Sequence, residues 1–169
     1  MPLEQLANIA EVFGLLVVAI TLIFLTIQMR QNTKMLRSTA THGAHDQITS
    51  FYHPLISDPS LTDLWLRGLN EPSELSAVET GRFFAWWLNT FFILQNWYFQ
   101  TREGLIDKEL LNSFSKLMTD MQQTPGVRNV WEQRKYMYAA DFVSYMDDEV
   151  FGRSPTHEYR PLGVAEEQH

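Results

Sequence analysis

The chain has 169 residues, a formal net charge of −7 and no cysteine. Without cysteine the sequence excludes disulfides, thiolate catalysis, iron–sulfur clusters and cysteine-ligated zinc. Its acidic balance, with no basic stripe, argues against general nucleic-acid binding, which depends on Lys and Arg side chains that neutralise phosphates. The composition is 45% hydrophobic and 13% aromatic, and the length allows one small domain besides the N-terminal segment described next.

Residues 12–29 form an apolar run without a charged side chain. As a helix this run reaches roughly 27 Å, about the thickness of the hydrocarbon core of a membrane. It is apolar on all sides, whereas a soluble helix normally keeps a polar face. The tail before it carries Glu4 and Glu11 and no basic residue, so it lacks the positive start of a cleaved signal peptide. We therefore predict that residues 1–29 are an N-terminal tail and a single-pass transmembrane anchor.

The basic residues predict the orientation of this anchor. All 13 Lys and Arg residues lie at or after Arg30, and Arg30, Lys34 and Arg37 follow the apolar run directly. The positive-inside rule places that side in the cytoplasm. We expect the N-terminus outside and a helical cytoplasmic domain over residues 30–151. In a Gram-negative cell the membrane would be the inner membrane.

Two features of the anchor predict contacts with another helix. Ala10 and Gly14 are small residues four positions apart, a spacing that lets two transmembrane backbones approach closely. Gln28, Gln31 and Asn32 share a face where lipid gives way to water, and amides there can bond across helices. The alternative for Gln28 is that its side chain simply reaches the lipid head groups.

The sequence after the anchor predicts helices and no strand. We expect the first helix to continue to about Phe51, with Gly43 as the place of any bend, and Pro54 and Pro59 to mark a break. A short helix over residues 61–69 follows. Its candidate caps are Ser57, Asp58 and Ser60.

Residues 83–101 form a second block without charges, and we expect it to be the central helix of the cytoplasmic domain. Ser73 or Ser76 caps this helix, and Glu79 completes a capping-box spacing with Ser76. Its amides, namely Asn89, Gln95, Asn96 and Gln100, argue against a second membrane span. A hairpin of two spans and an interfacial position remain as alternatives. The predicted core residues are Trp87, Phe91, Leu94 and Trp131.

Two further helices complete the predicted domain. Gly104 ends the central helix, and Asp107 caps a helix over residues 108–123 with good helical periodicity of its apolar residues. Pro125, after the cap Thr124, opens a last helix that runs to about Phe151.

Beyond these helices, residues 152–169 are expected to form a flexible C-terminal tail. The predicted fold is all-α: one long N-terminal transmembrane helix extended into the cytoplasm plus a small bundle of three or four helices.

The search for chemistry finds no recognisable active site. His42, His45 and Asp46 share a helical face and are a weak metal candidate; a solvated face is the simpler interpretation. The carboxylates near the end of the last predicted helix are read in the same way: Asp141, Asp147, Asp148 and Glu149. We therefore predict no catalytic residue, no metal site and no cofactor, and no enzyme.

The amides of the central helix need hydrogen-bond partners if they are buried. Hydrogen bonds between helices are the simplest solution, and a protein interface would also satisfy them. A third solution is a pocket for an amphipathic ligand between these amides and the indoles of Trp86, Trp87 and Trp97.

Three blocks of the sequence carry a resemblance: ANIAEVFGLLVVAITLIFLTIQMRQNTKMLR, REGLID and TPGVRNVWEQRKYMYAADFVSYMDDEV. Together they resemble a widespread set of uncharacterised bacterial membrane-anchored proteins, over residues 7–150. The most specific piece is the Arg-Gln-Asn-Thr exit that begins at Arg30. The resemblance implies the same architecture and carries no activity or catalytic residue with it.

From these observations we expect a membrane-anchored, non-enzymatic interaction protein. It would be an accessory or scaffold subunit of an inner-membrane complex, or a self-assembling oligomer, in contact with membrane lipids and not with nucleic acid. The alternative is a binding module or sensor for an apolar small molecule or lipid, built around the tryptophans of the central helix.

Overall fold

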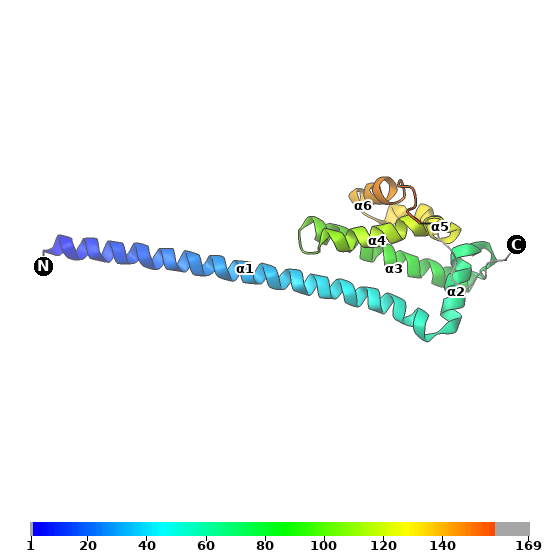
Figure 1. Ribbon diagram of the computed structural model, residues 1–169, viewed down its shortest axis with the longest axis horizontal. Coiled ribbons are helices and arrows are strands. Elements are labelled where there is room, and N and C mark those ends of the chain that lie inside the picture. Colours follow the sequence, from blue (N-terminus) through cyan, green and yellow to red (C-terminus); the bar gives the residue numbers. More distant parts are fainter. Residues whose placement is uncertain (1, 158–169) are drawn as a thin grey trace. The chain divides into compact units, whose positions relative to one another are not determined.

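The computed structural model describes residues 2–157, which fold into helices joined by short turns, with no strand among them (Figure 1). The α-helices are α1 Leu3–Ser57, α2 Pro59–Asn70, α3 Ala77–Arg102, α4 Lys108–Met121, α5 Pro125–Arg134 and α6 Ala140–Ser144. Short elements of tighter or wider pitch are η1 Pro72–Glu74, η2 Lys135–Met137 and η3 Tyr145–Val150. The all-α prediction, with one long apolar N-terminal helix, is confirmed.

The chain divides into two units, Met1–Thr39 and Ala40–His169. The first unit is the N-terminal part of α1, and all of its described side chains are exposed. The second unit contains the end of α1 and all later helices. The observed division therefore lies further along the chain than residue 29, where the apolar run ends.

Helix α1 extends past Pro54 to Ser57, so the predicted end near Phe51 is wrong. Proline removes one helical N–H, but only in the last turn, where the loss of a single bond is tolerated. Hydroxyl groups add hydrogen bonds to two carbonyls near the end of the helix. Ser57 Oγ donates to the carbonyl of His53 at 2.5 Å, and Thr62 Oγ1 donates to that of Leu55 at 2.5 Å.

The predicted caps of α2 and α3 are confirmed. Asp58 precedes α2, accepts the N–H of Ser60 at 2.9 Å and is followed by Pro59 in the first helical position. Ser76 and Glu79 form the reciprocal capping box of α3: the Glu79 carboxylate accepts the Ser76 N–H at 2.8 Å, and Ser76 Oγ accepts the Glu79 N–H.

Gly104 ends α3 as predicted, with a positive φ of 72° that favours glycine. The N–H of Leu105 bonds to the carbonyl of Gln100 at 2.8 Å, and the N–H of Gly104 bonds to that of Thr101 at 3.0 Å. These two bonds are a Schellman closure of the helix. They turn the chain so that α4 packs beside α3 (Figure 1).

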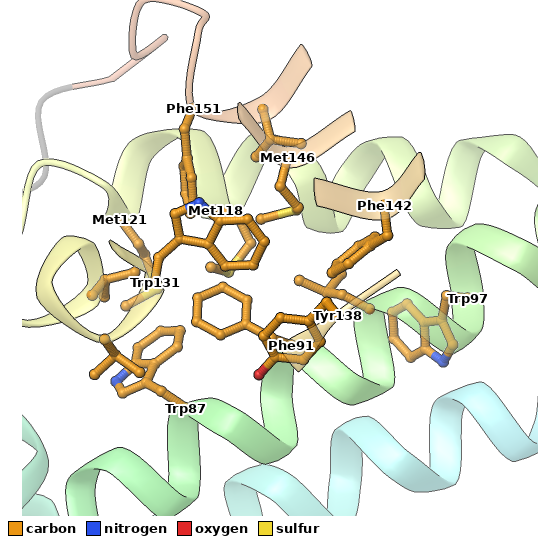
Figure 2. Packing of buried hydrophobic residues seen from close by; sticks show 14 of the residues in the cluster. Trp87, Phe91, Trp97, Met118, Met121, Trp131, Tyr138, Phe142, Met146 and Phe151 are labelled. Atoms are coloured by element: carbon orange, nitrogen blue, oxygen red, sulfur yellow. The ribbon is translucent and has the colours of Figure 1, made fainter. Parts of the chain in front are cut away.

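An aromatic cluster fills the core of the second unit, and Figure 2 shows its residues converging from α3, α4, α5 and the last elements. The Phe91 ring lies 4.9 Å from that of Trp131, on which Tyr138 stacks at 5.7 Å with 17° between the ring planes. All four predicted core residues are buried. Because α3 is covered on most sides by this packing, it is a core helix; by length and composition only α1 passes as a membrane span among the described helices.

The predicted single last helix is wrong. It breaks after Arg134, and Tyr138 and Ala139 are extended before α6 begins. Two contacts from α3 hold the break: Gln95 Oε1 accepts the N–H of Ala139 at 2.7 Å, and the Tyr138 hydroxyl donates to the carbonyl of Leu88 at 3.2 Å. The break lets the Tyr138 ring enter the aromatic cluster.

The chain beyond η3 is held as far as it is described. The Asp120 carboxylate accepts the backbone N–H groups of Thr156 at 2.8 Å and His157 at 3.2 Å. The amide of Gln122 donates to the carbonyl of Arg153 at 3.0 Å. The remainder of the expected flexible tail, residues 158–169, lies outside the described residues.

A pair of glycine substitutions tests the contact between α2 and α5. A Cβ on Gly126 would lie 1.9 Å from the carbonyl oxygen of Gly68, whereas a Cβ on Gly81 would meet nothing within 4 Å. We predict that Gly126→Ala lowers the free energy of unfolding by about 1–3 kcal/mol, because backbone must move. Gly81→Ala, the matched control in α3, should leave it unchanged or raise it by up to about 1 kcal/mol. Denaturant unfolding followed by tryptophan fluorescence measures both; equal effects would contradict the close approach.

The ion pair between α2 and α3 predicts a dependence on pH. Arg67 Nη2 lies 2.6 Å from Glu79 Oε1, and the pKa of Glu79 is lowered from 4.5 to about 2, first by Arg67 and then by Ser76. A pKa that is lower in the folded state stabilises above the unfolded value, and this stabilisation is lost as the pH falls from about 4.5 towards 2. The effect is modest because the two side chains are 34% and 31% exposed.

Thermal unfolding at pH 5.5 and 2.5 checks this dependence. We expect Glu79→Gln to melt at a lower temperature than the wild type at pH 5.5 and to lose less on acidification. Glu103→Gln, at an exposed position without an ion pair in the described part of the chain, is the matched control. If Glu79→Gln and Glu103→Gln respond alike to acid, Glu79 does not contribute in this way.

Candidate membrane-anchor and interaction surfaces

The apolar surface of α1 is the most conspicuous candidate for function. Between residues 12 and 29 every side chain is exposed, including large ones such as Phe13, Leu15 and Phe24. A soluble monomer rarely leaves a contiguous apolar surface of this size in water. Among the described residues, α1 is the one helix whose length and composition suit a membrane crossing. This surface is compatible with a membrane anchor.

The hydroxyl groups within and just after this run are already satisfied by the helix itself. Thr21 Oγ1 donates to the carbonyl of Val17 at 2.8 Å, and Thr26 Oγ1 donates to that of Leu22 at 2.8 Å. Thr33 makes the same bond to Met29 at 2.9 Å. Because hydrocarbon offers no hydrogen-bond partner, this back-bonding is what a threonine needs there. Gln28 is then the polar side chain of the run that still needs a partner or water.

Where the apolar run ends, α1 has a basic face on one side and an amide face on the opposite side. At 3.6 residues per turn, Arg30, Lys34 and Arg37 lie together with Thr33 on one side. Residues Thr26, Met29, Arg30, Thr33, Lys34 and Arg37 line a shallow hollow there. The three amides point to the other side. The predicted clustering of Gln28, Gln31 and Asn32 therefore follows from the observed helix, and all three are exposed.

The small residues and the amides fall on the same line of α1. Gln28 follows Ala10, and Asn32 follows Gly14, by 18 residues, about five full turns of an α-helix. We call Ala10, Gly14, Gln28 and Asn32 the contact stripe. A Cβ on Gly14 would meet nothing within 4 Å, so the backbone is open to close approach there. One straight partner helix could touch both ends of the contact stripe.

The weak metal candidate is not assembled. His42, His45 and Asp46 are all exposed, and His45 Nδ1 lies 3.0 Å from the carbonyl of Thr41 in its own helix. Within residues 2–157 no group of three His, Asp or Glu side chains is placed to hold a metal ion.

The carboxylates at the end of the chain are spread among structural pairs. Asp147 accepts the indole N–H of Trp131 at 2.7 Å and lies 3.1 Å from Lys135 Nζ, so it ties η3 to α5. Asp141 pairs with Arg102 at 2.7 Å, and Glu149 pairs with Arg153. Asp141, Asp148 and Glu149 are exposed, as the solvated face predicted from the sequence requires, and Asp147 is the half-buried exception.

The amide side chains of α3 differ in their hydrogen-bond partners and in their burial. Gln95 makes the hydrogen bond between elements that the sequence favoured, to the N–H of Ala139. Asn96 and Gln100 bond to each other at 3.1 Å on the surface, and Asn89 is exposed. Trp97 is buried and donates to Gln47 of α1 at 2.8 Å. Trp87 and Trp97, which the sequence offered together with Trp86 as walls of an alternative ligand pocket, therefore lie in packed core.

An apolar hollow does exist nearby, between α2 and α3. It has a volume of about 330 Å³ and is lined by Leu61, Leu64, Trp65, Arg82, Phe83, Ala85 and Trp86. Only Trp86 among these belongs to the pocket expected from the sequence. The helical periodicity of α2 signals its apolar face, but the hollow depends on how α2 crosses α3, and the order of residues does not give that crossing.

Comparisons of the chain with protein-family models, with curated proteins and with solved structures find no match.

Proposed function

We propose that this chain is a non-enzymatic interaction protein that α1 anchors in a membrane, as an accessory or scaffold subunit of a membrane complex or as a self-assembling oligomer. The observation that carries the proposal is the fully exposed apolar surface of residues 12–29. Burying one large aliphatic or aromatic side chain is worth about 1.5–3 kcal/mol, so leaving a whole helix of them in water would be very costly. Insertion into lipid removes that cost.

The orientation in the proposal follows from charge. The N-terminal tail has no Lys or Arg, and the basic face begins at Arg30. With the positive-inside rule this puts the N-terminus outside and residues 30–169 in the cytoplasm. In a Gram-negative cell this orientation corresponds to the cytoplasmic, or inner, membrane, which we propose as the location.

The contact stripe supports a helical partner within the membrane. Small residues at Ala10 and Gly14 permit close backbone approach, and the amides at Gln28 and Asn32 can bond across the interface. Both lie on one line of α1, so a second copy of α1 or a helix of another subunit could use them together. The basic face on the opposite side stays available to anionic lipid head groups.

Reporter fusions test the orientation. We predict that a reporter active only in the cytoplasm works when it is fused after His169, and that one active only outside works when it is fused before Met1. Replacing Arg30, Lys34 and Arg37 by Gln should weaken this preference, because these charges face the anionic, cytoplasmic side. The opposite pattern of reporter activity in the unaltered chain would overturn the proposed topology.

Photo-crosslinking from a single cysteine tests the contact stripe, since the chain has no native cysteine. A benzophenone attached to Cys at Gln31 should capture a partner in native membranes. The double substitution Gln28→Leu with Asn32→Ala should reduce capture roughly five- to tenfold, given about 0.6 kcal/mol for each lost bond.

Two controls use the other side of the helix. Met29→Leu with Thr33→Ala should leave capture from Gln31 unchanged, and a crosslinker at Thr33 should capture less than one at Gln31. If both double substitutions act equally, the amide face is only a solvated exit from the membrane.

A further inference from the structure

A second hollow lies beside the hollow between α2 and α3, further along α3. The second hollow, of about 270 Å³, is lined by Ser50, Phe51, Pro54, Ala85, Trp86 and Asn89. Both hollows share Ala85 and Trp86. We call the two together the Trp86 groove. Its length along α3, from Arg82 to Asn89, is about 10 Å at 1.5 Å per residue, so the groove holds the head-group end of an extended chain and not its whole length.

The lining of the Trp86 groove is apolar with one cation at one end. Leu61, Trp65 and Phe83 face the first hollow, and Phe51 and Pro54 face the second. Arg82 lines the first hollow, is exposed, and forms no ion pair within the described part of the chain. An Arg guanidinium beside an apolar groove matches a ligand with an apolar body and an anionic head.

The acidic groups near Arg82 are already engaged elsewhere. The pKa of the Asp58 carboxyl is lowered mainly by hydrogen bonds from Ser60, and Arg82 contributes only weakly. Glu79 accepts from Arg67 and Ser76. The guanidinium of Arg82 therefore keeps its hydrogen-bonding capacity for an anion from outside the chain.

Two indoles in the wall of the groove keep unused donors. The Nε1–H groups of Trp65 and Trp86 are shielded from solvent and have no acceptor among residues 2–157, and the same holds for Trp87 in the core. Buried donors without a partner are rare in folded proteins and mark a site worth explaining. A carboxylate that enters beside Arg82 brings acceptor oxygens to this wall, where a turn of either ring would let it donate.

We propose that the Trp86 groove binds a long-chain fatty acid, with its carboxylate at Arg82 and its acyl chain over Ala85 and Trp86 towards Phe51. The positive charge of Arg82 complements the carboxylate, and the two neighbouring hollows give an elongated apolar surface for the acyl chain. A chain anchored in a membrane is also close to a bilayer, which holds such molecules. The proposal rests on the proposed membrane anchor only for the nearness of a bilayer; it does not use the helix contacts in the membrane, and binding in the groove can be present or absent whatever those contacts do.

The test uses the full chain in phosphatidylcholine nanodiscs, with Ala85→Cys as its single cysteine and oleate as the probe. Oleate in the groove should slow the reaction of this thiol with a water-soluble maleimide, saturably and at least fivefold. Methyl oleate, which lacks the charge, should protect at least tenfold less well. A cysteine at the exposed Ser113 of α4 should react at the same rate throughout, which controls for effects of oleate on the bilayer.

Charge variants identify the head-group site. Arg82→Gln should require at least tenfold more oleate for half protection, and Arg82→Lys should restore part of the binding. Lys116→Gln, which removes one exposed positive charge from α4, should change nothing. Tryptophan fluorescence verifies that the variants remain folded.

Three results would overturn the proposal. One is the absence of protection by oleate at any concentration. Another is equal protection by methyl oleate or in Arg82→Gln, which would mean that oleate only partitions into apolar surface. The third is a disulfide-linked dimer through Ala85→Cys without added oleate, which would assign the groove to a second copy of the chain.

Discussion

The need to remove the apolar side chains of α1 from water is the constraint on which the rest of this chain depends. Residues 12–29 expose those side chains on every face, so no packing within one chain covers them. Lipid or another helix must do so, and the remaining features of α1 agree with this demand. The hydroxyls of Thr21 and Thr26 bond back to their own helix, the basic residues begin only at Arg30, and the one amide within residues 12–29 is Gln28, near the end of the run. The membrane anchor that we propose would fix where the domain can act.

Features set by neighbouring residues were predictable from the sequence. The Asp58 cap, the Ser76–Glu79 capping box and the Gly104 closure each depend on residues within a few positions of one another. The buried face of α3 followed from its spacing of aromatic residues, because a helix with so few polar positions must be covered. The apolar run of residues 12–29 and the basic cluster after it were also predictable, because each is a property of neighbouring residues and needs no tertiary information.

Features set by distant residues were not predictable. The last predicted helix is interrupted around Tyr138 although neither proline nor glycine is there. The amide of Gln95, far away in sequence, bonds to the backbone at the interruption, and the Tyr138 ring packs in the aromatic cluster because of it. Pro54 stays within α1, whose end also receives hydrogen bonds from the hydroxyls of Ser57 and Thr62, the latter from α2. The groove beside Trp86 likewise depends on the crossing of α2 with α3. The sequence offered a pocket among Trp86, Trp87 and Trp97 only as an alternative, and Trp87 and Trp97 are core residues.

Cysteine scanning along α1 in native membranes tests the central claim most directly. Single cysteines from residue 12 to residue 39 would be labelled with a membrane-impermeant maleimide applied to opened vesicles. The account predicts no labelling between residues 12 and 27, and strong labelling from residue 30 onwards, on all faces outside any partner contact. Labelling of central positions such as Ile20 and Phe24 at the rate of an exposed site, such as Ser113, would show that α1 does not lie in lipid and would contradict the account.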